Sequence, residues 1–404
     1  MKFKKLTIGN ICDFIGGSQP PKSEFSSNSL DGYIRLIQTR DYRTSEYLTY
    51  IPEKYAKKKC DVDDIMIGRY GPPIFQIFRG LKGAYNVALM KAVPKEGVDK
   101  EFLYYVLKQN AIFEYVDKLS PRTGGQTGVD LVSLNRYPVF LPENIVDQQK
   151  IIKPLVLIDK KIEINKSINL EIENFINLIY QYWFLQFNFP NLEGKPYVLS
   201  GGSLVFNSLV KKDIPQNWEV VQIKDILDKA PAVDKISAKD YLDKGTIPVI
   251  DQSQSFIAGF TNNHNAKILP HDAHIIFGDH TRAVKLANFA YARGADGTQV
   301  LASKNNRVPN YLLYNIVKNI DLSNFGYARH YKFLKETQCI IPDEVTAQKF
   351  NQLVSPLYEK IKLNILFNIE LERIRDSLLP MLVNGQISIR SAEKLIAKTF
   401  EQNE

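Results

Sequence analysis

The chain has 404 residues, more than a single hydrophobic core usually serves, so two domains are the first expectation. It contains no apolar run long enough to span a membrane, and its three cysteines, Cys12, Cys60 and Cys339, lie too far apart in the sequence to suggest a disulfide framework. The net charge of +8 favours a polyanionic partner, although many basic proteins bind no nucleic acid. The basic segment Met1–Lys5 is not followed by the apolar core of a signal peptide, so we expect a cytoplasmic protein.

The first segment, residues 1–142, predicts a compact domain with short strands broken by turns. The segments Ile34–Gln38, Asp64–Gly68 and Ala88–Val93 have strand character and end near Gly or Pro. Residues Glu101–Gln109 predict a short helix. The expected fold class of this domain is α+β.

Residues 143–190 predict a long helix, which runs from Asp147 to about Gln186 without a glycine. Apolar and Asn residues recur in it at steps of three and four, the spacing of a packed helical seam. The seam residues are Ile158, Ile162, Asn165, Asn169, Ile172, Ile176, Ile179 and Trp183.

Residues 191–215 are rich in Pro, Gly and Ser and predict a linker. A second domain is expected at 216–342, with a short helix at Asn310–Lys318, followed by a second long helix at 343–390. Its seam residues are Leu357, Ile361, Asn364, Asn368, Leu371, Leu378 and Leu382, in a frame that Arg375 interrupts. Residues 391–404 predict a short polar tail.

The second half of the chain repeats the first in a constant order. Ile34–Gln38 returns as Ile247–Asp251, and Asp64–Gly68 returns as His274–Gly278. Further matches link the short helices, the Pro that precedes each long helix, and the long helices themselves. A repeat of about two hundred residues is too long for a solenoid unit. We therefore expect two similar domains, each followed by a long helix, with the two helices packed as an antiparallel coiled coil.

Asparagine occupies the same two seam positions in both helices, at Asn165 and Asn169 and at Asn364 and Asn368. Buried Asn commonly fixes the register of a helix pair at a cost in stability. In an antiparallel pair these residues would meet near its centre. The alternative is that Asn165 and Asn364 face solvent on amphipathic surface helices.

We find no catalytic or metal-binding signature in the sequence. There is no Walker lysine motif, no dinucleotide fingerprint and no trusted pair of general acid and base. His271 and His274 lie close together, but no cysteine pair supports a zinc site. The expectation is a binding protein without a metal.

Arg, Lys, Gln and small polar residues on loops are the groups that read bases and contact phosphates. In the first domain the candidates are Gln38, Arg40, Arg69, Tyr70, Arg79, Arg122, Thr123, Gln126 and Thr127. In the second domain they are Gln252, Ser253, His280, Arg282, Lys285, Arg293, Arg329, His330 and Lys332. Several occupy corresponding places but differ in residue type, as two readers of different DNA half-sites would require.

The whole pattern resembles the specificity subunit of a Type I restriction-modification enzyme. The resemblance includes Gln148–Lys150 and Gln348–Lys349 at the starts of the helices, Ile214–Trp218, and Leu378–Ile387. It implies recognition of a bipartite duplex DNA target, two adenine-N6 methyltransferase subunits and two restriction subunits. It also implies that S-adenosylmethionine, ATP and Mg²⁺ are bound by those partners and that this chain carries no cofactor.

Two other interpretations stay open at this stage. The chain could be a two-headed protein-binding adaptor whose helices serve only as a spacer. It could also be a stand-alone DNA-modifying enzyme with an unfamiliar site. Binding to duplex DNA that weakens with salt would argue against the adaptor. A purified chain that neither hydrolyses nor methylates DNA without partners would argue against the enzyme.

Overall fold

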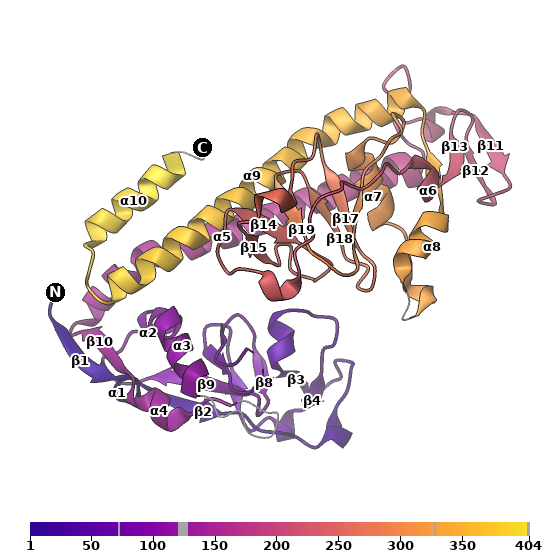
Figure 1. Cartoon of the computed structure of the whole chain (residues 1–404). Coiled ribbons are helices and arrows are strands. Elements are labelled where there is room, and N and C mark those ends of the chain that lie inside the picture. Colours follow the sequence, from indigo (N-terminus) through magenta and orange to yellow (C-terminus); the bar gives the residue numbers. More distant parts are fainter. Residues whose placement is uncertain (72, 120–127, 327–328, 402–404) are drawn as a thin grey trace. The chain divides into compact units, whose positions relative to one another are not determined.

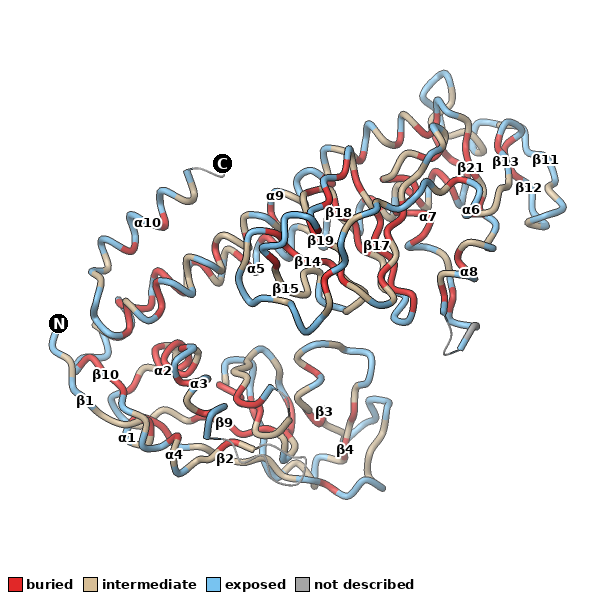
Figure 2. Tube along the Cα trace, in the orientation of Figure 1, coloured by how far each residue is buried: buried red, intermediate tan, exposed pale blue. Residues whose placement is uncertain are grey.

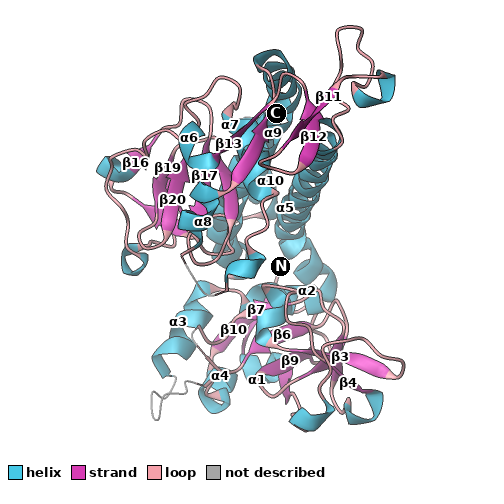
Figure 3. Ribbon diagram, turned by 90° about the vertical axis from the view of Figure 1, so that its right-hand side faces the viewer, coloured by secondary structure: helices cyan, strands magenta, loops and turns pink. Residues whose placement is uncertain are grey.

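The structure is a computed structural model that describes residues 1–401 except 72, 120–127 and 327–328. It forms two compact units, which divide both long helices near their middle. Unit 1 comprises Met1–Ile162 and Ile369–Glu404, and unit 2 comprises Glu163–Asn368. Short strands and short helices occur in both units, as the α+β prediction required (Figures 1 and 3).

Unit 1 contains three small sheets with the strand orders β4-β3-β8-β5, β2-β9-β6-β7 and β1-β10. The strands are β1 (Phe3–Thr7), β2 (Cys12–Gly16), β3 (Tyr33–Ile37), β4 (Tyr50–Pro52), β5 (Lys59–Cys60), β6 (Ile65–Gly68), β7 (Ile77–Phe78), β8 (Gly83–Tyr85), β9 (Leu89–Pro94) and β10 (Pro138–Pro142). The short helices are α1 (Ile8–Ile11), α2 (Lys100–Leu107), α3 (Asn110–Leu119) and α4 (Leu131–Arg136). The predicted strands and the predicted helix after Pro94 are all present.

Unit 2 has sheets with the orders β15-β14-β19-β16, β18-β17-β20, β13-β21 and β11-β12. The strands are β11 (Leu204–Asn207), β12 (Lys212–Pro215), β13 (Glu219–Gln222), β14 (Ile247–Ile250), β15 (Gly259–Thr261), β16 (Lys267–Ile268), β17 (His274–Gly278), β18 (Val284–Ala287), β19 (Tyr291–Arg293), β20 (Thr298–Leu301) and β21 (Gln338–Ile341). The short helices are α6 (Ile223–Ile226), α7 (Asn310–Lys318) and α8 (His330–Glu336).

The two units repeat the same strand pairing. In unit 1, β3 pairs with β4 antiparallel and with β8 parallel, and β8 pairs with β5 antiparallel. In unit 2, β14 pairs with β15 antiparallel and with β19 parallel, and β19 pairs with β16 antiparallel. The pairs β6 with β9 and β17 with β20 correspond, as do β1 with β10 and β13 with β21. The internal repeat in the sequence is therefore a repeat of topology.

The long helices are α5 (Ile145–Tyr180), which ends in a π-helical turn at Gln181–Leu185, and α9 (Glu344–Val383). They run antiparallel, and within each unit they contact each other through the predicted seam. The buried seam residues are Ile158, Ile162, Asn165, Ile176, Trp183, Ile361, Asn364, Asn368, Leu371, Leu378 and Leu382. The heptad spacing thus identified the buried faces of both helices.

The four seam Asn residues form two crossed pairs in unit 2. Asn165 Nδ2 donates to Asn368 Oδ1 at 2.8 Å, and Asn364 Nδ2 donates to Asn169 Oδ1 at 2.7 Å. Asn165 and Asn364 are only 2% and 4% exposed, so the surface-helix alternative is wrong. Each amide is satisfied only when the two helices keep this register.

In unit 1 the seam contains an ion pair where Arg375 interrupts the apolar frame. Arg375 Nη1 donates to Asp159 Oδ1 at 2.8 Å, and the Tyr105 hydroxyl donates to Asp159 Oδ2 at 2.7 Å. Both charged side chains are 16% exposed. Burial alone would raise the pKa of Asp159, but nearby Lys108 and the bonds from Arg375 and Tyr105 lower it overall.

The segment after α5 is packed more firmly than a linker. Phe184 and Phe350 meet edge to face at 5.0 Å between ring centroids, and Phe189 stacks on Trp218 at 5.0 Å. In Figure 2 buried residues concentrate along β17 and α7 of this unit. These aromatic contacts attach the chain that follows α5 to the core of unit 2.

Two sequence expectations need correction. The linker prediction for residues 191–215 missed the hairpin β11–β12, in which Leu204–Asn207 pairs antiparallel with Lys212–Pro215. The predicted polar tail forms helix α10 (Ile389–Glu401), whose Ala392 and Ile396 are buried. These two residues lie four apart on one helix face, which explains how a mostly polar segment folds as an amphipathic helix.

Candidate nucleic-acid interface

The segments that follow β2, β3 and β8 converge at one edge of unit 1. Because β3 and β8 are parallel, their carboxyl ends lie at the same edge. The Asn86 N–H after β8 donates to the Ile37 carbonyl of β3 at 3.1 Å. The Ser18 N–H after β2 donates to the Tyr85 carbonyl at 3.2 Å. Three chain segments therefore meet at what we call the loop edge of unit 1.

Gln38 and Arg40 lie together on this edge. Gln38 Nε2 donates to Thr49 Oγ1 at 3.1 Å, and Arg40 Nη2 approaches the same oxygen at 3.3 Å. Below them Asp41 is buried, and burial raises the pKa of its carboxyl against the opposing effects of the Gln38 N–H, Arg35 and Arg40. Arg40 itself is exposed and can reach an anionic partner.

The remaining predicted residues of unit 1 differ in their accessibility. Arg69 is half-buried, with its guanidinium 5.1 Å from the Tyr70 ring centroid. Arg79 forms an ion pair with Glu101 at 2.6 Å and lies over the Tyr104 ring, so its guanidinium is engaged inside the unit. The other predicted residues lie outside the residues that the structure describes; they are Arg122, Thr123, Gln126 and Thr127.

Unit 2 has a corresponding loop edge, because β14 and β19 are also parallel. Gln252, which follows β14, joins two further loops through both ends of its amide. Its Nε2 donates to the Asp296 carbonyl at 3.0 Å, and its Oε1 accepts from the His280 N–H at 3.1 Å. Gly297, with φ of +70°, leaves room for this amide, since a Cβ there would lie 2.6 Å from Gln252 Nε2. Gln252 therefore positions the loops.

The exposed predicted residues of unit 2 lie on the loops that surround Gln252. His280 and Arg282 lie on the turn between β17 and β18, where Arg282 adopts a left-handed φ of +59°. Arg329 and Lys332 lie at the start of α8 and are also exposed. Ser253 is half-buried, and its hydroxyl donates to Asp251 Oδ1 at 2.6 Å. The turn and the helix start present cationic side chains to solvent.

Three predicted residues of unit 2 are not placed as the sequence suggested. Lys285 is buried, and its ammonium donates to the Asp251 carbonyl at 2.8 Å; burial lowers its pKa to about 8. His330 is buried between the carbonyls of Asp279 and Gly326. Arg293 donates through Nε to the Thr298 carbonyl at 2.8 Å, and burial lowers its pKa. Lys285 and His330 were predicted to contact DNA directly. Because both are buried, we correct this prediction: their hydrogen bonds position the loops.

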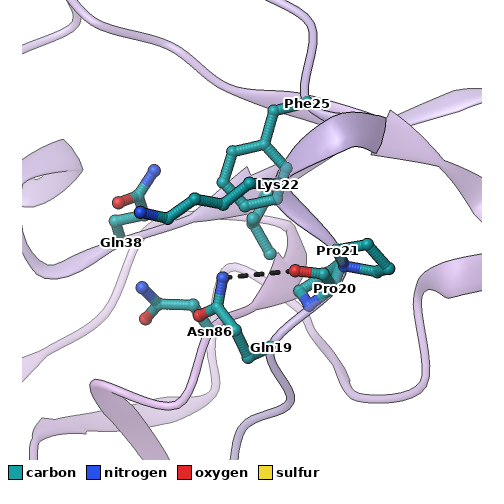
Figure 4. A pocket seen from close by; sticks show the side chains of 8 residues that line it. Gln19, Pro20, Pro21, Lys22, Phe25, Gln38 and Asn86 are labelled. Carbon is teal, nitrogen blue, oxygen red and sulfur yellow. Dashed lines mark hydrogen bonds between the residues drawn. The ribbon is translucent and has the colours of Figure 1, made fainter.

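The structure also brings together residues that sequence reasoning missed. Gln19, Lys22 and Asn86 line a pocket of about 610 Å³ with Gln38 and Phe25 on the loop edge of unit 1 (Figure 4). No local motif marks these residues. The position of Asn86 depends on the parallel pairing of β3 with β8, which joins segments almost fifty residues apart.

Neither a metal site nor a membrane span is found within the described part of the chain. No three His, Cys, Asp or Glu side chains gather there as metal ligands. Among the helices whose residues are described, none has the length and apolarity needed to cross a membrane.

Comparison with known proteins identifies the family. Residues 1–174 and 215–373 match the Type I restriction modification DNA specificity domain. The chain belongs to this family. The specificity subunit of the Type I restriction enzyme MjaIX from Methanocaldococcus jannaschii is 28% identical over 417 residues, which cover 95% of this chain and 93% of that protein.

A solved specificity subunit has a similar fold. The S subunit of a Type I restriction-modification system from M. genitalium matches with a TM-score of 0.52 at 16% identity, covering 95% of this chain and 96% of that chain. The family match confirms the resemblance inferred from the sequence. The chain is a non-catalytic Type I DNA specificity subunit with two similar domains and two long helices.

Proposed function

We propose that this specificity subunit reads a bipartite duplex DNA target, with one half-site recognised at the loop edge of each unit. The observation that carries the proposal is a repeated topology with different polar residues at corresponding loops. Gln38 follows β3 where Asp251 follows β14, and Arg69 follows β6 where Asp279 follows β17. A constant scaffold with unlike polar loops suits two readers of unlike sequences.

In this proposal the helices α5 and α9 set the spacing between the two readers. α5 has 36 residues, which correspond to about 54 Å at 1.5 Å per residue. That length is compatible with half-sites about one DNA turn apart, roughly 34 Å. The crossed Asn pairs favour a single register of the two helices and hence one spacing.

The partners proposed for the chain are two adenine-N6 methyltransferase subunits and two restriction subunits. S-adenosylmethionine, ATP and Mg²⁺ would be bound by those subunits, and this chain would hold no cofactor. Its own contribution would be recognition and placement, supported by the net charge of +8 and by exposed cations such as Arg282 and Lys332.

The test is a genome-wide map of N6-methyladenine in cells that express the partner methyltransferase with and without this chain. We expect a split motif that occurs only when the chain is present. If the methyltransferase is expressed and active but no chain-dependent motif is found, the proposal fails, and the protein-adaptor interpretation takes its place.

A further inference from the structure

The pocket on the loop edge of unit 1 is a built site. Gln19 and Lys22 come from the segment after β2, Gln38 follows β3 and Asn86 follows β8; the Phe25 ring supplies an apolar wall. Figure 4 shows the three amides and the Lys22 side chain around the same hollow. No acidic residue lines it. The amides therefore suit an uncharged polar group, and Lys22 suits an anionic chain that carries this group.

The backbone holds this site rigidly. The Gly17 N–H donates to the Leu89 carbonyl at 2.9 Å, and the Asn86 N–H donates to the Ile37 carbonyl at 3.1 Å. A Cβ at Gly17 would lie 2.0 Å from the Asn86 carbonyl oxygen, so only glycine permits the segment after β2 to approach this closely. The side chains of the pocket project from a fixed frame.

Two of the amides are oriented by their own hydrogen bonds. Asn86 Oδ1 accepts from the Ala88 N–H at 3.1 Å, which leaves Nδ2 as the hydrogen-bond donor toward the pocket. Gln38 Nε2 donates to Thr49 Oγ1 at 3.1 Å, which leaves Oε1 as an acceptor. The Asn86 and Gln38 amides thus offer one donor and one acceptor, with the Lys22 ammonium nearby. The third amide, that of Gln19, is held in place by its Nε2, which donates to the Pro20 carbonyl at 3.3 Å.

Among the bases, adenine matches this combination. Its major-groove edge carries the N7 acceptor and the N6 amino donor, whereas guanine presents two acceptors and would require two donors. We propose that this pocket reads an adenine in the half-site recognised by unit 1, with Asn86 Nδ2 donating to N7 and Gln38 Oε1 accepting from N6. Lys22 contacts the adjoining phosphate. This assignment rests on the proposed function and names specificity-determining residues for it.

Unit 2 does not repeat the pair formed by Asn86 and Gln38. The Gly294 N–H donates to the Ile250 carbonyl at 3.0 Å, which is the counterpart of the bond from Asn86 to Ile37. Gly294 therefore replaces Asn86, and Asp251 replaces Gln38. The adenine reader belongs to unit 1 alone, so the effect of a variant must be confined to one half-site.

The experiment uses the chain assembled with its methyltransferase subunits, after the motif has been mapped and the unit 1 half assigned by exchange of residues 1–142. Binding is measured to the motif duplex and to duplexes in which each adenine is replaced in turn by 7-deazaadenine, which lacks N7. The variant Asn86→Asp keeps the oxygen that accepts from Ala88 but removes the donor. Asn135→Asp makes the same chemical change at an exposed position of α4 and is the matched control.

We expect 7-deazaadenine at one position of the unit 1 half-site to weaken binding of the wild-type complex about tenfold. Asn86→Asp should bind the unmodified duplex about tenfold more weakly and show no further loss at that position. Asn135→Asp should behave like the wild type. The other half-site should respond identically in all three proteins.

The assignment is overturned if Asn86→Asp keeps the wild-type response at every adenine, or if the unit 1 half-site contains no adenine. In both cases the complex still recognises its motif and the proposed function stands. Absence of a chain-dependent motif in the wild type would overturn the proposed function itself, and the assignment with it.

Discussion

Polar side chains on the loop edges of the two units perform two different tasks. Gln252 and Lys285 direct their hydrogen-bonding groups inward and hold neighbouring loops together. Arg282 and Lys332 are exposed and have the charge that a phosphate or a guanine edge would attract. Residue type alone does not separate these tasks, whereas burial does.

The exposed cations of unit 2 should differ in how they affect DNA binding. Lys332→Ala should weaken binding to all sequences alike and reduce the slope of log K against log salt by about 1, as expected for the loss of one phosphate contact. Arg282→Ala should cost about 1–3 kcal/mol of discrimination at one base pair of one half-site. Fluorescence anisotropy at several salt concentrations, on the cognate duplex and on single-base variants, measures both. A uniform effect of Arg282→Ala would identify it as a phosphate contact instead.

Asp64 should give unit 1 an acid-sensitive component of stability. Burial raises the pKa of its carboxyl, but hydrogen bonds from Lys100, the Asp61 N–H and Lys91 outweigh this and lower the pKa to about 2. Because the pKa is lower in the folded state, the stabilisation is complete above the unfolded value near 4 and is lost as pH falls from about 4 to about 2.

The variant Asp64→Asn should therefore lower the free energy of unfolding at pH 7 by about 1–2 kcal/mol. This value is smaller than the full pKa shift implies, because solvent partly screens the charges around Asp64. The difference from the wild type should shrink toward pH 3. Urea unfolding at the two pH values measures it, with the exposed Asp31→Asn as control. A difference that does not depend on pH would attribute the loss to packing.

At the scale of single elements, α5 and α9 combine an apolar seam with polar groups that are satisfied only across the pair. Asn368→Leu should leave the buried Asn165 amide without its partner at a cost of about 1–3 kcal/mol. Replacing both residues by Leu should recover most of that loss, because no buried amide then lacks a partner. Denaturant unfolding of the two single variants and the double variant forms the cycle. Additive losses would mean that the two amides do not interact.

The same helices should determine the distance between half-sites. We expect seven residues inserted between Asn165 and Asn169, and seven between Asn364 and Asn368, to preserve the seam and lengthen each helix by about 10 Å. The tolerated spacer in the methylation motif should then grow by about three base pairs. An unchanged spacer in the N6-methyladenine map would exclude the helices as the source of spacing.

For the whole molecule, the repeat in topology predicts that the readers can be exchanged. The segment 1–142 begins with β1 and ends with β10, and these two strands pair with each other, with Phe3 opposite Pro142. Exchange of this segment for that of another specificity subunit should change one half of the methylated motif and leave the other intact. A change in both halves would contradict two independent readers.

Periodicity and repeats made most of this architecture predictable. The seam spacing identified α5 and α9 and placed Asn165 opposite its partner helix, and the helix predicted at Asn310–Lys318 is α7. Features that depend on contacts between distant segments could not be predicted. The burial of Lys285 depends on Asp251, which lies more than thirty residues away in the sequence. Helix α10, by contrast, has a local i, i+4 pattern at Ala392 and Ile396 that the prediction of a polar tail overlooked.

The exposure of the predicted DNA-binding residues followed from residue type at some positions and not at others. Arg40 and Arg282 are exposed on loops, as their residue type suggested. His330 is buried, and its ring nitrogens lie within hydrogen-bond distance of the Asp279 and Gly326 carbonyls. Asn86 was missed because only the parallel pairing of β3 with β8 brings it beside Gln38. Gln19 was missed because its segment is placed by the bond from the Ser18 N–H to the Tyr85 carbonyl, a contact between distant parts of the chain.

The ion pair between Arg375 and Asp159 distinguishes the two halves of a molecule whose repeat suggests descent from a half-length ancestor. In the repeat, Arg375 takes the place of Ile176, and Asp159 takes the place of Tyr358. Two identical first halves would set Asp159 against an isoleucine, and two identical second halves would set Arg375 against a tyrosine. Only unlike halves bring the Arg375 guanidinium against the Asp159 carboxylate. The difference at these two positions of the repeat therefore favours pairing of the unlike halves over pairing of two identical ones.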